Sequence, residues 1–486
     1  MDAPRIRVLA TAFAAVPGSS PHSAALLAMA ASVRAEVDLV TIKTEALSHV
    51  ERLGDARMFR VPVGEARPLE ARVVFDRAVG RQLEAERYDV VHVRGPFEGM
   101  LAAERKSAYG YQLVYEMATF PDEALGAEVE RRWAEAHARC VADADLLLVP
   151  TEAARRAVGE SLPPERVVVL PPGVDVGAYD WRPQTPSAVP RLLYLGSFTA
   201  DRDLSTVLEA IRRVSTARPV RVLMAGETDR SRRDRLRRMV DAFGLTAVVE
   251  IRGEPASRTL PQIIAGADLC LAPASEVPRF QSLGDLPQPL LEYLACHRPV
   301  VAAGVPGVVD VLRDEHEGLL YAPGDEGGLT DAILEMLRDQ SLRERTTESG
   351  YRRVRESFSS GARRRRIAEV YERLVPGSQG TDPWADSFED PATGEAEVVS
   401  SISGVVMETS SNDTIAPASD ETHDPEHVTH SFEFDTGEQP APSTFPGLEI
   451  SPSTSPVDTD PGSLMPSEAL VSEKTRPRST DTDPGA

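Results

Sequence analysis

Cysteine is scarce in this sequence, which has three in 486 residues: Cys140, Cys270 and Cys296. Three cysteines cannot form a disulfide framework over such a length, and they indicate a reducing compartment. No run approaches the roughly 20 consecutive apolar residues of a membrane span. The apolar run near the N-terminus is interrupted by Pro17 and Gly18 and alternates like a strand, which argues against a signal peptide. We therefore expect a soluble, cytoplasmic protein.

Two nucleotide-binding motifs are absent as well. No phosphate-binding loop ends in Gly-Lys-Ser or Gly-Lys-Thr, and no Gly-x-Gly-x-x-Gly pattern follows the first expected strand. These absences argue against a nucleoside triphosphatase and against an NAD-dependent enzyme.

Aromatic residues do not alternate with the basic ones in the two arginine-rich runs, RSRRDRLRR (230–238) and RRRR (363–366). A nucleic-acid partner is therefore not expected. The simpler interpretation of each run is a solvated helix face. The alternative is attraction to an anionic membrane surface, as a peripheral enzyme at the inner face of a membrane would need.

The negative charge of the sequence is concentrated in its C-terminal part. The chain has a formal net charge of −23, and from Gly377 onward 22 acidic residues stand against 3 basic ones. This part is rich in Ser, Thr, Pro and Asp and has no sustained hydrophobic periodicity, so it cannot bury enough apolar surface to offset its ordering entropy. We expect residues 377–486 to be a disordered acidic tail, with shielding of the basic runs or partner binding as hypotheses for its role.

The rest of the chain alternates short apolar runs with helical patterns. Such continuous apolar runs, each followed by a helix, predict parallel strands covered on both faces. A Pro- and Gly-rich segment at 171–191 separates two sets of runs and predicts a linker. The runs lie at 6–13, 37–42, 88–93, 112–117, 144–149 and 166–170 before it, and at 191–196, 220–226, 247–253, 267–273, 298–303 and 318–323 after it.

The predicted fold class is therefore α/β, with two successive parallel units. We expect a domain at 1–171, a linker at 172–190, a second domain at 191–358 and a C-terminal helix within 359–376. Helices are also expected at 325–338, 340–357 and 361–374.

Several residues stand where open α/β sheets bind ligands, after the carboxyl ends of strands. Gly18 follows the first run before a helix whose N-terminus can hold an anion, although an ordinary strand–helix turn is the simpler interpretation. Gly196 ends the first strand of the second unit, and Arg202 lies at the start of the next helix, placed to meet a diphosphate. Asp201 and Asp203 around it resemble an Asp-x-Asp metal motif, but we favour helix capping by Asp203.

The segment LPQPLLEYLACHRPVV contains Glu292, Cys296 and His297. Adjacent Cys and His side chains are badly placed to chelate one zinc, so we expect Cys296 to pack as a small apolar residue. Glu292 is a lone acid on an apolar helix, which is costly unless a partner binds it. The sequence leaves two candidates for this partner of Glu292: the hydroxyl groups of a ligand, or a neighbouring arginine.

Four blocks in this order resemble family 4 of the retaining glycosyltransferases: VVVLPPGVD (167–175), YLGSFTADRDLSTVLEA (194–210), LLEYLACHRPVVAAGVPGVVDVL (290–312) and EGLLYAPGD (317–325). In the first half YDVVHVRGPFEG (88–99) and ADLLLVPTEAARRAV (144–158) agree. The resemblance implies a GT-B fold, in which two Rossmann-like, doubly wound domains face each other across a cleft. The C-terminal domain would bind a nucleotide-sugar, the N-terminal domain would bind the acceptor, and the last helix would cross back to the N-terminal domain.

The resemblance also implies roles for single residues. Glu292 matches the second Glu of the family's Glu-x7-Glu motif, which hydrogen-bonds the nucleotide ribose. Arg202 matches the basic residue that holds the donor diphosphate and stabilises the leaving group. Gly18 matches the N-terminal loop near the donor phosphates, and the segment of Leu286, Pro287 and Gln288 matches the loop whose amides contact the donor.

Three positions depart from the family pattern. The first Glu of the motif falls on Gly284, with Asp285 one place away as a substitute, and the Arg that usually follows the second-domain glycine is Ser197. The family's histidine is absent from VYEMATF (114–120). We name Glu116 or Glu123 as sources of polar chemistry there, and we interpret His92 as adjacent to the cleft and structural.

The resulting hypothesis is a retaining, metal-independent glycosyltransferase that needs no cofactor. It would move a sugar from a nucleotide-sugar onto a glycan, a lipid-linked acceptor or a small molecule, in glycan or polysaccharide synthesis. The departures motivate an alternative, a catalytically degenerate protein that binds a nucleotide-sugar or glycan as an assembly or regulatory subunit. A third hypothesis is that the protein is an epimerase or phosphorylase with the same fold. Interconversion of free nucleotide-sugars would distinguish it.

Overall fold

The computed structural model describes residues 6–16, 21–33, 35–44, 47–53, 56–64, 68–118, 120, 126–159, 162–179, 187–226 and 229–376. The described residues belong to one compact unit. The predicted tail at 377–486 lies outside them, as do Gly18 and Glu123. No helix within the described ranges is long and apolar enough to cross a membrane.

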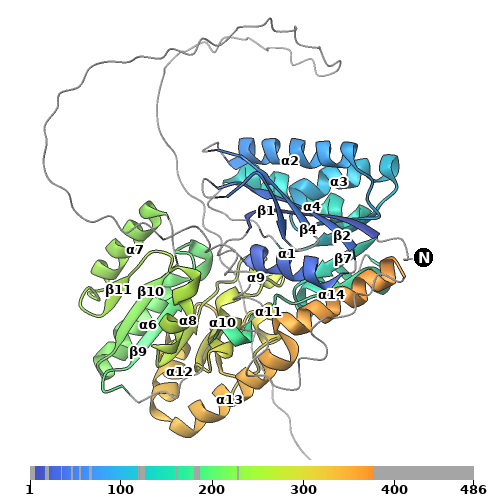
Figure 1. Cartoon of the computed structure of the whole chain (residues 1–486). Coiled ribbons are helices and arrows are strands. Elements are labelled where there is room, and N and C mark those ends of the chain that lie inside the picture. Colours follow the sequence, from blue (N-terminus) through green and yellow to red (C-terminus); the bar gives the residue numbers. More distant parts are fainter. Residues whose placement is uncertain are drawn as a thin grey trace, which may run out of the picture. The chain divides into compact units, whose positions relative to one another are not determined.

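The first half of the chain forms an eight-stranded sheet with the order β3-β4-β2-β1-β5-β6-β7-β8 (Figure 1). All neighbouring strands are parallel except β3 and β4, which are antiparallel. The strands are β1 (Ile6–Ala15), β2 (Ala35–Ile42), β3 (Val50–Leu53), β4 (Ala56–Val61), β5 (Val90–Val93), β6 (Gln112–Glu116), β7 (Leu146–Val149) and β8 (Val167–Val169).

The sequence analysis missed β3 and β4, because arginines interrupt the apolar pattern of β4. The guanidinium group of Arg57 donates two hydrogen bonds of 2.7 Å to the carboxylate of Asp38 on β2. Arg60 is buried and donates to the carbonyl oxygens of Val16 at 2.7 Å and Ser48 at 2.9 Å. Because the sheet satisfies both side chains, a strand with two arginines is stable here.

Helices cover both faces of this sheet, and each face has its own apolar core (Figure 1). On one face, Leu26 and Met29 of α1 pack with Ile367 and Tyr371 of α14, the last helix of the described chain. On the other face lie α2, α3 and α4. The helices of this half are α1 (Pro21–Ser32), α2 (Pro68–Ala85), α3 (Pro96–Tyr109), α4 (Ala127–Asp143), α5 (Glu152–Gly159) and α14 (Ser360–Leu374).

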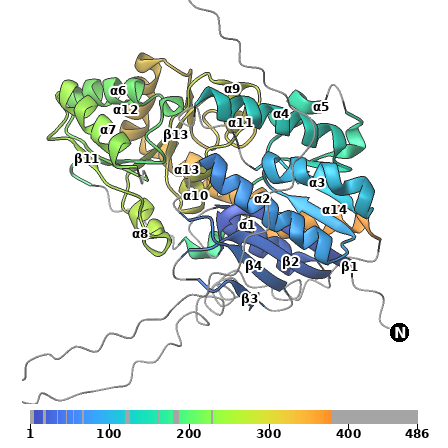
Figure 2. The same ribbon diagram turned by 90° about the horizontal axis from the view of Figure 1, so that it is seen from above.

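The second half forms a parallel six-stranded sheet with the order β11-β10-β9-β12-β13-β14. Its strands are β9 (Arg191–Leu195), β10 (Arg221–Ala225), β11 (Val249–Ile251), β12 (Leu269–Ala272), β13 (Val300–Ala303) and β14 (Leu319–Tyr321). Its helices are α6 (Leu204–Ala217), α7 (Arg230–Ala242), α8 (Leu260–Ala265), α9 (Pro278–Gln281), α10 (Gln288–Ala295), α11 (Pro306–Val309), α12 (Glu326–Arg338) and α13 (Gln340–Ser357). Helices α6 and α12 lie side by side in both views (Figures 1 and 2).

The last three helices, all predicted from the sequence, begin at side-chain caps. Asp325 accepts from the amide of Gly328, and Asp339 accepts from the amide of Leu342. Ser359 accepts from the amide of Ala362 at the start of α14. Such caps satisfy amide groups that have no partner inside the helix.

Each sheet reverses its strand order at one place, between β1 and β5 in the first sheet and between β9 and β12 in the second. At such a place the chain leaves two neighbouring parallel strands in opposite directions. A crevice opens there at the carboxyl ends of the strands, and open α/β sheets bind their ligands in it. The structure therefore locates the candidate site at the ends of β1, β5 and β6 in one half and of β9 and β12 in the other.

Candidate functional site

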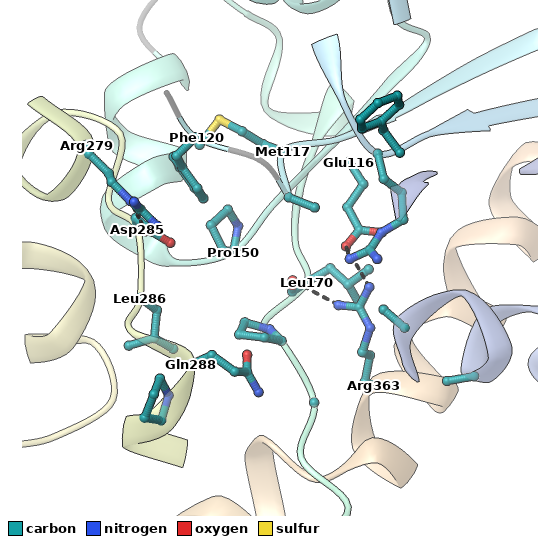
Figure 3. A pocket seen from close by; sticks show the side chains of 18 of the residues that line it. Glu116, Met117, Phe120, Pro150, Leu170, Arg279, Asp285, Leu286, Gln288 and Arg363 are labelled. Carbon is teal, nitrogen blue, oxygen red and sulfur yellow. Dashed lines mark hydrogen bonds and ion pairs between the residues drawn. The ribbon is translucent and has the colours of Figure 1, made fainter. Parts of the chain in front are cut away.

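A cavity of about 450 Å³ lies between the two halves, at the carboxyl ends of both sheets (Figure 3). Helix α14 contributes to its wall as well. The lining residues are Phe13, Ala25, Ala28, Arg72, Arg94, Glu116, Met117, Ala118, Phe120, Pro150, Leu170, Pro172 and Gly173, together with Arg202, Arg279, Asp285, Leu286, Gln288, Pro289, Ser360 and Arg363.

Arg202 reaches this cavity from a 3-10 turn, Ala200–Arg202, that precedes α6. It belongs to a cluster of two arginines and two aspartates, which we call the donor-side cluster. Arg279 Nε donates to Asp285 Oδ2 at 2.6 Å, and Arg279 Nη1 donates to Asp201 Oδ2 at 3.2 Å. Arg202 Nε lies 4.0 Å from the same Asp201 oxygen. One carboxylate thus holds two guanidinium groups close together.

The ring of Phe280 supports the same two arginines. Its centroid lies 5.1 Å from the Arg202 guanidinium carbon and 5.4 Å from that of Arg279, within cation–π range. The Arg202 side chain is 12% exposed, and its buried Nε and Asp201 Oδ1 have no hydrogen-bond partner among the described residues. Buried polar atoms without partners are costly, so these two atoms point to a polar ligand.

Asp203 does not cap α6 as the sequence analysis expected. It occupies the N-cap position, but its backbone has a φ of 47° and its side chain makes no capping hydrogen bond. The carboxylate instead accepts from Ser205 Oγ at 3.3 Å. Among the residues described by the structure, no group of three or more His, Cys, Asp or Glu is arranged to hold a metal ion.

Gly196 directly follows β9, in a backbone conformation that residues with a side chain rarely adopt. Its φ is 145°, and a Cβ atom there would lie 2.9 Å from the hydroxyl oxygen of Tyr194. The neighbouring amide of Leu195 donates to the buried hydroxyl of Tyr293 on α10 at 2.8 Å. This contact joins the end of β9 to the helix that carries Glu292.

The segment predicted to contact the donor leads into α10. Leu286 and Gln288 line the cavity, and Pro287 occupies the N-cap position without a side-chain cap. Pro289 has no N–H group and the amide of Leu290 donates to the carbonyl oxygen of Pro287 at 3.0 Å, so the amide of Gln288 is the group at this helix N-terminus that can meet an anion.

Glu292 is not among the residues that line the cavity. The hydroxyl of Tyr179, from the segment between the two sheets, donates a hydrogen bond to its carboxylate. Burial raises the pKa of Glu292 to about 7, and the Tyr179 hydroxyl opposes that rise. In the structure the hydroxyl of Tyr179, which was not considered from the sequence, binds this acid.

The opposite wall carries a second ionic cluster, which we call the Glu116 cluster. Glu116 ends β6, and its two oxygens accept from Arg94 Nε at 3.0 Å and Arg94 Nη2 at 2.8 Å. Arg363 Nη2 of α14 donates to the same carboxylate at 2.7 Å. His92 Nε2 lies 3.2 Å from Glu116 Oε2, and His92 Nδ1 lies 3.0 Å from the hydroxyl of Tyr371.

These contacts fix the charges of the Glu116 cluster. Burial raises the pKa of Glu116, but Arg363 and Arg94 outweigh it and hold that pKa well below its usual range. Burial lowers the pKa of His92, so its imidazole is neutral near pH 7. Glu116 is therefore ionised at neutral pH and pairs with two arginines, and its lowered pKa makes it a weak base.

The sequence analysis missed Arg94, Arg279 and Arg363 as cavity residues. Arg94 directly follows the buried strand β5, a position that could have indicated it. The run 363–366 was interpreted as a solvated face, and this is wrong for Arg363, which is 4% exposed. It lies one turn before Ile367, on the side of α14 that packs against the first sheet.

The positions that depart from the family pattern have structural consequences. Ala118, where the family's histidine would stand, lines the cavity without a polar side chain. Ser197 Oγ is hydrogen-bonded to Thr199 Oγ1 at 2.9 Å, and it does not line the cavity. Asp285, named as a substitute for the carboxylate missing at Gly284, accepts a hydrogen bond from Arg279 and lines the cavity.

Cys296 packs as expected, and His297 follows it at the end of α10. Cys296 is fully buried at the end of α10 and packs in the core of the second half. His297 has a φ of 49°, the left-handed conformation for which glycine is favoured, and its ring lies against Tyr351 with 3.7 Å between centroids.

Two family descriptions match this chain in succession. Residues 18–173 match the family described as glycosyl transferase 4-like domain, and residues 189–339 match the family described as glycosyl transferases group 1. Alpha-D-kanosaminyltransferase from Streptomyces kanamyceticus is 27% identical over 38% of this chain and 46% of its own length. Phosphatidyl-myo-inositol mannosyltransferase from Mycobacterium leprae is 30% identical over 46% of this chain and 58% of its own length. The matches thus span about half the length of these curated relatives.

A longer match is to D-inositol 3-phosphate glycosyltransferase from Nocardioides, 27% identical over 62% of this chain and 71% of that protein. Among solved structures, sucrose-phosphate synthase from Thermosynechococcus elongatus has a TM-score of 0.64 at 20% identity, covering 76% of this chain and 99% of its own. HepE from Anabaena, in complex with UDP-glucose, has a TM-score of 0.60 at 16% identity, covering 76% of this chain and 100% of its own. These likenesses confirm the predicted GT-B fold.

Proposed function

This chain belongs to the glycosyl transferases group 1 family, and from this premise we propose that it transfers a sugar from a nucleotide-sugar donor to an acceptor. The observation that carries the proposal is the donor-side cluster beside the start of α10. Two guanidinium groups and a helix N-terminus at one cavity are suited to a diphosphate, since both bind oxyanions. HepE, which has the same fold, was solved with UDP-glucose, and a donor of that class fits the proposal.

The mechanism that we propose retains the configuration of the sugar and requires no metal ion or other cofactor. The bond between the sugar's anomeric carbon and the diphosphate breaks, and Arg202 and Arg279 stabilise the negative charge that grows on the leaving oxygen. The acceptor oxygen bonds to the same face of that carbon, and its proton passes to the departing phosphate. Ala118 and the ionised Glu116 supply no side-chain base there, so stabilisation of the leaving group carries much of the rate.

We propose a glycan, lipid-linked or small-molecule acceptor, bound on the side of the first sheet. The relatives named above support transfer to such acceptors, and because all of them are named as enzymes the catalytically degenerate alternative is not favoured. We also propose that the protein acts in the cytoplasm, and that it acts at the inner face of the membrane if its acceptor is lipid-linked. Helix α7 supports it, because Arg230, Arg235, Arg237 and Arg238 are exposed on this helix, while Asp234 pairs with Arg230 and Arg237.

Replacing Arg202 or Arg279 with alanine is expected to weaken donor binding about tenfold or more, because each removes a charge-assisted contact to the diphosphate. Isothermal titration of the full chain with a panel of nucleotide-sugars measures this. Arg212→Ala is the matched control, since Arg212 is exposed on α6 and paired with Glu209. Release of nucleoside diphosphate together with a glycosylated acceptor then tests turnover. If no nucleotide-sugar bound, or if both arginine variants bound as wild type, the assignment would fail.

Glu292 does not line the cavity in this structure, but the family resemblance implies that it contacts the ribose hydroxyl groups of the bound donor, and we include this contact in the proposal. It leads to a pH-dependent prediction. Because its pKa is raised to about 7, the carboxylate forms as the pH rises through that value. A carboxylate accepts two hydroxyl donors, so affinity for the best nucleotide-sugar of the panel is expected to rise between about pH 6 and pH 8. The donor's diphosphate diester keeps its charge in that range. Glu292→Gln should abolish the pH dependence, and an unchanged profile in this variant would contradict the role.

A further inference from the structure

The two halves of the chain are joined where the chain crosses between them. It crosses at 170–174 and at 358–360, and the crossings pair with each other, since Val174 N donates to Phe358 O at 2.9 Å and Ser360 N donates to Val174 O at 2.8 Å. The halves also touch at the start of α5, away from these crossings. Two domains move relative to each other unless their interface is large and apolar. A contact away from the crossings therefore helps to decide how the halves face each other.

Asp310 of the second half binds the N-terminus of a helix of the first half. It directly follows α11, which packs against α5 (Figure 2). Asp310 Oδ2 accepts a hydrogen bond of 2.6 Å from the amide of Ala153 in the first turn of α5, and Asp310 Oδ1 lies 3.5 Å from Arg156 Nη2. A carboxylate is stabilised at a helix N-terminus by the amide groups and by the helix dipole. The charge of Asp310 therefore joins the two halves.

Thr151 makes a second bond between the halves, from the opposite direction. Its hydroxyl donates to Gly284 O at 2.7 Å and accepts from the amide of Ala154 at 3.1 Å, and the residue is buried. One hydroxyl group thus caps α5 within the first half and binds a loop of the second half. We call the set of Thr151, Ala153, Gly284 and Asp310 the α5 contact.

The α5 contact is directly connected to the donor-side cluster. Gly284 precedes Asp285, which accepts from Arg279 Nε at 2.6 Å. The same loop is tightly packed on α11, because a Cβ atom on Gly307 would lie 2.5 Å from Asp285 O and 2.7 Å from Gly284 O. Pro150, at the edge of the contact, lines the cavity together with Asp285 and Arg279. A change at the α5 contact would therefore move the donor-side cluster relative to the wall that the first half forms.

The α5 contact contributes more to the arrangement of the halves than to their stability. Water can replace the partner of each polar group when the halves separate, and such an exchange of hydrogen bonds has a small net free energy. Within the first half, α5 keeps the cap that Thr151 provides. What Asp310 adds is a charge-assisted bond of defined direction and length, and such a bond fixes orientation.

We propose that Thr151 and Asp310 are positioning residues for sugar transfer, which hold the donor-side cluster at the distance from the first half that the reaction requires. The inference rests on the proposed function, because it takes Arg202 and Arg279 as the groups that bind the donor diphosphate. In that function the acceptor lies on the side of the first sheet, so the relative position of the halves sets the distance between the reacting atoms. A misplacement of about 1 Å can cost about a hundredfold in rate.

The distance between the halves tests the contact without any substrate. The full-length protein is spin-labelled at Ala108→Cys on α3 and Ala242→Cys on α7, exposed positions in the two halves, while the three native cysteines are buried. Pulsed dipolar spectroscopy is expected to give a narrow distance distribution for this parent protein. The distribution should broaden or shift in Asp310→Ala, because that variant loses the bond to Ala153.

A second variant and a matched control complete this measurement. Thr151→Val removes the bond to Gly284 and should change the distribution as well. Asp339→Ala is the control, since Asp339 caps α13 by accepting from the amide of Leu342 at 2.9 Å, entirely within the second half. It also loses a helix cap, but it should leave the distance unchanged. A distribution equal to the parent's in either of the first two variants, or an equal change in Asp339→Ala, would overturn the proposal.

Turnover is measured with the nucleotide-sugar of the panel that binds most tightly and the acceptor that it glycosylates. We expect Asp310→Ala to lower kcat by about tenfold to a hundredfold, because the reacting atoms are misplaced. The Kd of the donor should change far less, since the donor-side cluster stays intact within the second half. Asp310→Asn keeps an oxygen that accepts from the amide of Ala153 and is expected to restore most of kcat. Equal losses of donor affinity and kcat in Asp310→Ala would contradict the positioning role.

Failure of the proposed function gives a different pattern. A protein that neither binds nor turns over a nucleotide-sugar refutes that function, whether or not the distances change. Distances that change in Asp310→Ala while kcat stays at the wild-type value refute the positioning role and leave the proposed function standing.

Discussion

Gly284→Ala is expected to lower the free energy of unfolding by about 2–5 kcal/mol, the sum of a left-handed backbone penalty and overpacking. Gly284 has a φ of 63°, which a residue with a Cβ atom rarely adopts. A Cβ atom there would lie 2.6 Å from the amide nitrogen of Ala154 and 2.8 Å from Thr151 Oγ1. Neither contact is easily relieved, because the first is to backbone and Thr151 donates a 2.7 Å hydrogen bond to Gly284 O.

Gly324→Ala is the matched control for this prediction. Gly324 has a φ of 77° in the same half of the chain, but a Cβ atom there would meet nothing within 4 Å. It therefore measures the backbone penalty alone, about 1–2 kcal/mol. Urea denaturation of both variants gives the difference, and equal losses would show that the close contact at Gly284 contributes nothing.

The same substitution is expected to weaken donor binding. Gly284 precedes Asp285, which holds Arg279, and its carbonyl oxygen is tied to Thr151 at the start of α5. A shift of this loop would move the donor-side cluster relative to the first sheet. The contact also explains a departure from the family pattern, because the space for the family's glutamate is occupied by the backbone of Ala153 and Ala154.

The parallel strands were predictable because their apolar runs are continuous and bounded. The run at 267–273, for example, contains β12 (Leu269–Ala272), every residue of which is buried. Strand β4 was not predictable, because it contains Arg60. This side chain is satisfied by hydrogen bonds to Val16 and Ser48 that form only when the chain folds. A pattern in one segment cannot indicate a partner supplied by another.

The candidate site follows the same division. Arg202 was named because it stands at the start of a recognisable helix, and Leu286 and Gln288 were named because their segment resembles the family's donor loop. All three line the cavity. The Glu116 cluster was not assembled from the sequence, because Arg363 lies 247 positions from Glu116. Glu292 was correctly identified as an acid in need of a partner, but only the fold brings Tyr179 to it.

Glu116→Gln is expected to cost about 3–5 kcal/mol of unfolding free energy at neutral pH, the effect of breaking a buried ion pair and leaving charges unpaired. The variant leaves Arg94 and Arg363 buried at 6% and 4% exposure with no carboxylate between them. Glu128→Gln is the control, because Glu128 also binds two arginines, Arg131 and Arg132, but on the exposed surface of α4. Solvent screens these surface ion pairs, so the change in unfolding free energy in Glu128→Gln should be barely measurable.

The pH dependence of this difference identifies the charge on Glu116 as its cause. A carboxylate whose pKa is depressed in the folded state stabilises the protein fully above its unfolded pKa of about 4.3, and this contribution disappears as the pH falls through the folded value. The difference between wild type and Glu116→Gln should therefore be constant from about pH 7 to pH 5 and shrink in more acidic solution. Denaturant titrations across that range measure it. A difference that grew toward acid would mean that Glu116 is protonated in the folded protein at neutral pH.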